Sequence, residues 1–330
     1  MASNDFLAFG GGGAANVIDQ ATYAALAARL TGFQSGTAQS AQLNKVWRQS
    51  SIMSAVLAQF IVDLTGRDAI DDGTTASLLA NLKAAVQAQS AAVVGQARNV
   101  AMSVTTASTS ATLNADEIVV GTALAGQKYM LGAFSKTINL ATTGAGGMDT
   151  GSAPASGYVA LYAIYNPTTG ASALLATNAT SAVAPSAYGG ANMPTGYTAS
   201  ALVSVWPTNG SGQFVTGYQR DRTFYCGART AFTVTAGTGS YTSISVSGSV
   251  PQNAKRIFGS VSANSNTSQS LGLNIAGDSS GAGFSGVGAN GVSCAGSYVS
   301  PIITPQAIYY LATGSSGTLS FVCNITSYEI

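Results

Sequence analysis

Histidine is absent from this chain of 330 residues. Imidazole is the commonest general base, a frequent ligand of transition metals and the usual partner of a serine or cysteine nucleophile, so the commonest routes to such chemistry are missing. The three cysteines, Cys226, Cys294 and Cys323, are widely separated and form no Cys-x-x-Cys pair. That spacing does not fit a zinc site, and we interpret the cysteines as buried free thiols. We therefore expect no metal and no cofactor.

Charge is also scarce. Charged side chains make up 8% of the residues, and 13 Lys and Arg against 12 Asp and Glu leave a net charge of +1. An ordinary soluble domain carries about 25% charged residues. Because the basic residues are scattered, the chain offers no basic patch to nucleic acid or to an anionic membrane. We expect no nucleic-acid partner, and polarity is instead carried by Ser, Thr, Asn, Gln and 39 glycines.

Long apolar runs are missing as well. No run approaches the ~20 residues that a helix needs to cross a bilayer. The residues after Met1 are polar and lack the cationic start of a classical signal peptide. These features predict synthesis in the cytoplasm and no insertion into a membrane, and if the chain leaves the cytoplasm they predict a route other than secretion.

The stretch between residues 43 and 64 carries the clearest periodicity. Positions separated alternately by three and four residues are apolar except for Ser50, and they are Leu43, Val46, Ser50, Met53, Leu57, Phe60 and Leu64. Such spacing is typical of the seam of a coiled coil, and it predicts that copies of this helix wind together. Two amphipathic helices packed inside one domain would give the same pattern and remain an alternative. A further helix is predicted after Gly73, ending near Val100.

The first 18 residues are predicted to form an arm. Phe6, Leu7 and Phe9 precede four consecutive glycines, which favour a flexible connection over a helix. The apolar side chains before these glycines either insert into another protein or belong to a frayed terminus. Asp19 is then a suitable N-cap for a short helix.

After Met102 the pattern changes to the alternation typical of strands. Residues 158–165 are almost wholly apolar and predict a buried central strand. Together with short runs bounded by turns, this favours compact antiparallel sandwiches. The expected fold is mixed: an N-terminal α-helical, trimeric coiled-coil-like stalk followed by mainly-β, sandwich-like domains. The predicted parts are a docking arm with a short helix (1–38), a helical bundle or coiled-coil stalk (39–104), a central β domain (113–222) and a C-terminal β domain (223–330).

Carboxylates are too sparse for most hydrolytic sites. Glycoside hydrolysis needs two carboxyl groups about 5–10 Å apart. The acidic residues after Glu117 are Asp149, Asp221, Asp278 and Glu329. Asp221, between Arg220 and Arg222, indicates a local charge cluster at a domain junction. We expect no enzyme and name no catalytic residue, although a trimer could assemble a carboxylate pair across chains; a polysaccharide-cleaving hydrolase is the alternative.

Several long segments carry a family resemblance. The first reads DFLAFGGGGAANVIDQATYAALAARLTGFQSGTAQSAQLNKVWRQSSIMSAVLAQFI and is followed by DDGTTASLLANLKAAV. Later ones read KTINLATTGAGGMDTG, SGYVALYAIYNPTTGASALLATNAT and YGGANMPTGYTASALVSVWPTNG. They resemble the tail-fibre proteins of tailed bacteriophages over about residues 4–220, and the resemblance does not extend to residues 224–330.

The resemblance implies a homotrimeric fibre of the virion, made in the host cytoplasm. Its N-terminal part would dock on tail or baseplate proteins through Phe6, Leu7 and Phe9, and residues 43–64 would form the trimer seam. Its distal end would adsorb to the host through a cell-surface glycan, a pilus or an outer-membrane protein. A purely structural connector of the tail or baseplate is a further alternative.

Receptor contacts would then lie in the unmatched C-terminal region. Residues 262–269 and 277–291 are rich in Asn, Ser and Gly, and we interpret them as loops that present hydrogen-bonding groups on a rigid frame. The candidate receptor-binding residues are Asn264, Asn266, Asp278, Phe284 and Asn290.

Overall fold

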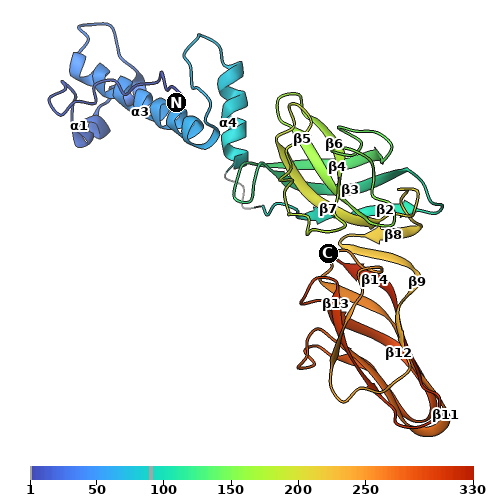
Figure 1. Cartoon of the computed structure of the whole chain (residues 1–330). Helices are drawn as coiled ribbons and strands as arrows, with labels where there is room; N and C mark the ends of the chain where they lie inside the picture. The colour runs from blue at the N-terminus through green and yellow to red at the C-terminus, as the bar shows by residue number, and fades with distance from the viewer. Residues whose placement is uncertain (1, 89–91) are drawn as a thin grey trace. The chain divides into compact units, whose positions relative to one another are not determined.

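The structure, a computed structural model, describes residues 2–88 and 92–330 (Figure 1). The chain divides into two compact units, residues 1–91 and residues 92–330. Four helices belong to the first unit as far as it is described, and the described part of the second unit consists of strands and connections. We call the first the helical unit and the second the β unit.

The helical unit is built from helices of very different lengths. They are α1 (Gln20–Ala25), α2 (Ala28–Thr31), α3 (Ser40–Thr65) and α4 (Ala76–Ala88). The predicted N-cap is confirmed, because the carboxylate of Asp19 accepts a hydrogen bond from the backbone N–H of Thr22 at the start of α1. No helix among the described residues is long and apolar enough to cross a membrane.

The predicted coiled-coil stalk is wrong. Helix α3 has 26 residues and ends at Gly66, which adopts the left-handed conformation, and the next helix, α4, has 13. The helix expected to reach Val100 is described as far as Ala88, residues 89–91 lie outside the described residues, and Ala97–Arg98 and Ala101–Val104 are the strands β1 and β2. Parts of the same chain pack on α3, as in the alternative that the pattern left open, but the buried residues of α3 are Lys45, Ala58 and Ile61, none of which is a predicted seam position.

The N-terminal arm supplies part of that packing. The ring of Phe9 meets the ring of Trp47 edge-on, with the centroids 5.7 Å apart, and its backbone N–H donates to the hydroxyl of Ser51. Near the other end of α3, Phe6 lines an apolar groove of about 310 Å³ together with Leu57 of α3 and Leu82 of α4. The arm is therefore placed along the helix by contacts within its own unit.

The β unit contains one large antiparallel sheet. Besides β1 and β2, its strands are β3 (Ser110–Gly121), β4 (Lys128–Asn139), β5 (Tyr158–Asn166), β6 (Ala171–Asn178), β7 (Ala199–Pro207), β8 (Gly217–Arg220), β9 (Thr223–Val234), β10 (Thr242–Ser245), β11 (Arg256–Ala276), β12 (Ser285–Pro301), β13 (Ala307–Thr313) and β14 (Ser320–Glu329). The main strand order is β10-β13-β11-β14-β9-β8-β2-β3-β7-β5-β6. The predicted buried strand over residues 158–165 is confirmed as β5, which lies between β6 and β7.

The expected fold class of separate sandwich-like domains is also wrong, because this sheet runs without a break through residue 222. Strands β8 and β9 flank that position, are joined through Asp221 and Arg222, and pair with each other. Strand β9 then pairs with β14, the last strand of the chain. Asp221 and Arg222 form a tight turn at the predicted boundary between the two β domains, and the curled sheet continues across this turn.

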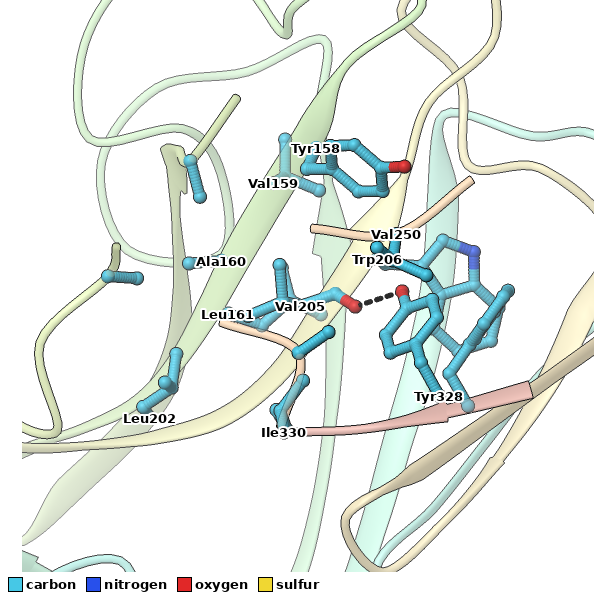
Figure 2. Packing of buried hydrophobic residues seen from close by; sticks show 14 of the residues in the cluster. Tyr158, Val159, Ala160, Leu161, Leu202, Val205, Trp206, Val250, Tyr328 and Ile330 are labelled. Atoms are coloured by element: carbon cyan, nitrogen blue, oxygen red, sulfur yellow. Dashed lines mark hydrogen bonds between the residues drawn. The ribbon is translucent and has the colours of Figure 1, made fainter. Parts of the chain in front are cut away.

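The last strand anchors the C-terminal half of the β unit in the central half (Figure 2). Tyr328 of β14 lies close to Trp206 of β7, and its hydroxyl donates a hydrogen bond of 2.6 Å to the carbonyl oxygen of Val205. Its ring packs against that of Phe224, which in turn meets Trp206 edge-on. Side chains from both halves thus share one continuous hydrophobic core.

The three cysteines are free thiols in different environments. Cys323 is buried, its thiol lies 3.2 Å from the hydroxyl of Tyr298, and burial raises the pKa of the thiol to about 12. Cys226 and Cys294 are half-buried, and burial also raises the pKa of each thiol.

Because the thiolate is the reactive form, we expect iodoacetamide at pH 8 to modify Cys226 and Cys294 slowly and to leave Cys323 unmodified in the folded protein. Mass spectrometry of peptides after timed labelling measures the three rates, with urea-unfolded protein as the control. Equal rates at all three positions in the folded chain would contradict this assignment.

Candidate functional site

The longest strands of the β unit form a ribbon that folds over on itself. Strand β11 pairs with β12 over nearly its whole length, and the register shifts between Asn264 and Gln269. Before this shift the other neighbour of β11 is β14, and after it the neighbour is β13. The ribbon therefore bends here and passes from one part of the curled sheet to the next (Figure 1). We call residues 264–269, 290–293 and 314–319 around this bend the fold-over surface.

Gln269 holds the fold-over surface together. Its side-chain oxygen accepts hydrogen bonds from the backbone N–H groups of Ser315 and Ser316, at 2.7 and 2.9 Å. Its side-chain nitrogen donates to the hydroxyl of Ser265 at 2.9 Å and to the carbonyl oxygen of Ser316. One amide thus fixes the connection between β13 and β14 against the bend of β11.

Asn266 fixes the other end of the same connection. Its side-chain oxygen accepts a hydrogen bond of 2.7 Å from the backbone N–H of Thr318. The preceding residue, Gly317, has a φ of 77°, and a Cβ atom there would overlap the side chains of Asn266 and Thr267. A glycine is therefore required at this position. The surface is held in one shape before any ligand arrives.

The fold-over surface carries no charge. Between residues 257 and 328 the sequence contains a single charged residue, Asp278, which lies outside this surface. Asn264, Thr267 and Ser268 are exposed, and Val292 is 51% exposed beside them on β12. Such a surface offers hydrogen-bonding groups and apolar contacts and no charged side chain.

The structure divides the five candidate receptor-binding residues into two groups. Asn264, Asn266 and Asn290 belong to the fold-over surface. Asp278 and Phe284 lie on the connection from β11 to β12, whose Gly283 approaches Pro301 at the end of β12. This connection closes the β11–β12 hairpin and lies beside Pro301, whereas the fold-over surface is at the bend in the middle of the ribbon. The sequence therefore grouped residues that the structure separates.

Asp278 has a local structural role. Its carboxylate accepts hydrogen bonds from the backbone N–H groups of Ala282 and Ser280 and from the hydroxyl of Ser280. These bonds, that from Ala282 first, lower the pKa of the carboxyl group. Phe284 is exposed next to this turn.

The residues interpreted as loops are largely strand. Residues 262–269 fall inside β11, and residues 285–291 fall inside β12. Gln269 lies in a segment that the sequence indicated but was not among the candidate residues, and Ser315, Ser316 and Val292 of the fold-over surface were outside the indicated segments. Their only sequence signal was the low charge of the region, because small polar residues give no apolar alternation.

The expected docking residues differ in exposure. Phe6 is half-buried in the groove between α3 and α4, Phe9 rests on Trp47, and Leu7 is 79% exposed. The residues of the predicted trimer seam also differ in exposure. Half-buried are Leu43, Val46, Phe60 and Leu64; exposed are Ser50, Met53 and Leu57.

Metal sites and known relatives add nothing further. The described residues contain no cluster of three or more His, Cys, Asp or Glu side chains suited to hold a metal ion. Neither a scan against models of known protein families nor a search of curated proteins found a match to this chain.

Proposed function

We propose that the chain is a tail fibre of a tailed bacteriophage, carried by the virion, which attaches to the host cell through the fold-over surface. The observation that carries this proposal is the rigid, uncharged set of hydrogen-bonding groups that Gln269 holds at the bend of the β11–β12 ribbon. The sequence resemblance over residues 4–220 gives independent support. Synthesis takes place in the host cytoplasm.

Adsorption through this surface needs no bond to be made or broken. Exposed amides and hydroxyls match the hydroxyl groups of a cell-surface glycan or the polar surface of a pilus or outer-membrane protein. Several weak contacts on linked copies give strong attachment through avidity. Host polysaccharide incubated with the chain therefore keeps its length, and release of oligosaccharides would favour a hydrolase.

The helical unit is proposed to provide the virion end and to bring copies together as a homotrimer. Its described residues leave large apolar side chains exposed, among them Leu7, Met53 and Leu57. Leu57 and the exposed Leu79 line one apolar groove, and apolar surface gathered in this way marks a contact with protein. Tail or baseplate proteins and further copies of the chain are the partners that this proposal assigns to them.

The direct test introduces charge into the fold-over surface. Labelled full-length chain is titrated onto the bacterium on which the virus is grown, and bound label is counted. We expect Val292→Arg to weaken binding about tenfold or more, because a bulky charge would be desolvated in the contact. Val299→Arg is the matched control, since Val299 is an exposed valine of the same strand outside this surface. Equal binding by the two variants would contradict the proposal.

A further inference from the structure

A cavity of about 430 Å³ opens in the β unit among residues that do not belong to the fold-over surface. Its walls come from the connection between β6 and β7, from β7, from the β8–β9 turn and from the residues before β11. This volume lies within the range of pockets that hold small molecules.

Two cations line this cavity. Arg222 is half-buried, and its Nη1 and Nη2 atoms donate to the carbonyl oxygens of Leu202 and Gly95, at 2.9 and 2.6 Å. A guanidinium has five N–H groups, so donors remain after these bonds. Lys255 contributes an exposed ammonium group.

Neither cation has an acidic partner. In the part of the chain that the structure describes, Arg222 and Lys255 form no ion pair. The nearby acidic side chain of Glu329 is bound 3.0 Å from Arg256, which does not line the cavity. Arg222 and Lys255 line the same cavity as Ile330 and, within the described residues, form no ion pair, so both cations can bind an anionic group.

The frame of the cavity is fixed by hydrogen bonds. Asn253 accepts from the backbone N–H of Ala184 at 2.9 Å and donates to its carbonyl oxygen at 2.8 Å. The backbone N–H of Lys255 donates to the backbone carbonyl oxygen of Glu329, and that of Ile330 donates to the backbone carbonyl oxygen of Arg222. The segments that carry both cations are therefore held together before a ligand binds.

We propose that this cavity binds a monosaccharide that carries a carboxylate or phosphate group. The anionic group lies between Arg222 and Lys255, the aliphatic walls of Pro185 and Leu202 face the C–H side of the ring, and Ser186 offers a hydroxyl to its polar edge. This site goes beyond attachment at the fold-over surface and does not depend on it.

Calorimetric titration of the full-length chain at low salt tests the ligand class. Sodium glucuronate, glucose 6-phosphate, glucose and inorganic phosphate are the four probes. We expect one or both of the anionic sugars to bind at least about tenfold more tightly than glucose and than inorganic phosphate, with affinity falling as salt is added. Glucose binding equally well, inorganic phosphate binding equally well, or no binding of either anionic sugar at millimolar concentration would each overturn the proposal.

Two adjacent cations provide the matched variants. Lys255→Gln is expected to weaken binding of the anionic sugar about tenfold, whereas Arg256→Gln leaves it unchanged. Thermal unfolding checks that both variants are folded, and cell binding through the fold-over surface should be unaffected by either. Equal affinities of the two variants would contradict the assignment, whatever the outcome at the fold-over surface.

Discussion

Replacing Tyr328 by alanine is expected to lower the free energy of unfolding of the β unit by about 3–5 kcal/mol. The side chain is 1% exposed and packs against Phe224. Truncation leaves a cavity where β14 meets the central half, and it removes the donor from the buried carbonyl oxygen of Val205. Because one core serves both halves, they should still unfold in a single transition.

Urea denaturation followed by near-ultraviolet circular dichroism measures this loss. Tyr225→Ala is the matched control, since Tyr225 is 46% exposed on β9 and its removal should cost less than about 1 kcal/mol. Tyr328→Phe separates the hydrogen bond from the packing. Equal losses for Tyr328→Ala and Tyr225→Ala would show that the last strand does not join the halves.

Replacing Gly259 by alanine is expected to destabilise the β unit by about 3 kcal/mol. Gly259 lies on β11 where the register with β14 shifts. A Cβ atom at this position would overlap the carbonyl oxygen of Asn324, and backbone atoms on the neighbouring strand cannot rotate away. The strands must therefore separate locally and lose hydrogen bonds.

Gly227→Ala in β9 is the control for this second change. A Cβ atom on Gly227 meets nothing within 4 Å, so its effect should stay within about 0.5 kcal/mol. The midpoints of thermal unfolding of the two variants are compared under identical conditions. If Gly259→Ala unfolds at the same temperature as Gly227→Ala, the close approach of β11 and β14 is not present in solution.

Local features of this chain could be predicted from the sequence, because their causes are local. The apolar run over residues 158–165 gave a buried central strand, and Asp19 gave a helix cap. The coiled-coil prediction for α3 was wrong for a physical reason. Three-four spacing shows which face of a helix is apolar, and it leaves open what covers that face. The groups that pack on α3, Phe9 on Trp47 and Leu82 beside Leu57, are distant from those residues in sequence and gave no signal.

The two proposed binding surfaces depend on long-range pairing, so the sequence could not reveal them. Gln269 and Ser316 are 47 residues apart, and only the change of partner by β11 brings them together. Arg222 was interpreted as part of a local charge cluster, yet its guanidinium donates to backbone carbonyls and lines a cavity with Lys255. The connection around Asp278 was recognised as polar, but it lies beside Pro301 at the end of β12 and away from the bend that forms the fold-over surface.

Competition for adsorption tests attachment through the fold-over surface most directly. Virions are mixed with their host in the presence of soluble full-length chain, and the rate at which free virions disappear is measured. The wild-type chain and Val299→Arg should slow adsorption in proportion to their concentration, and Val292→Arg should not. Undiminished adsorption at saturating wild-type chain, or equal inhibition by all three proteins, would contradict the account.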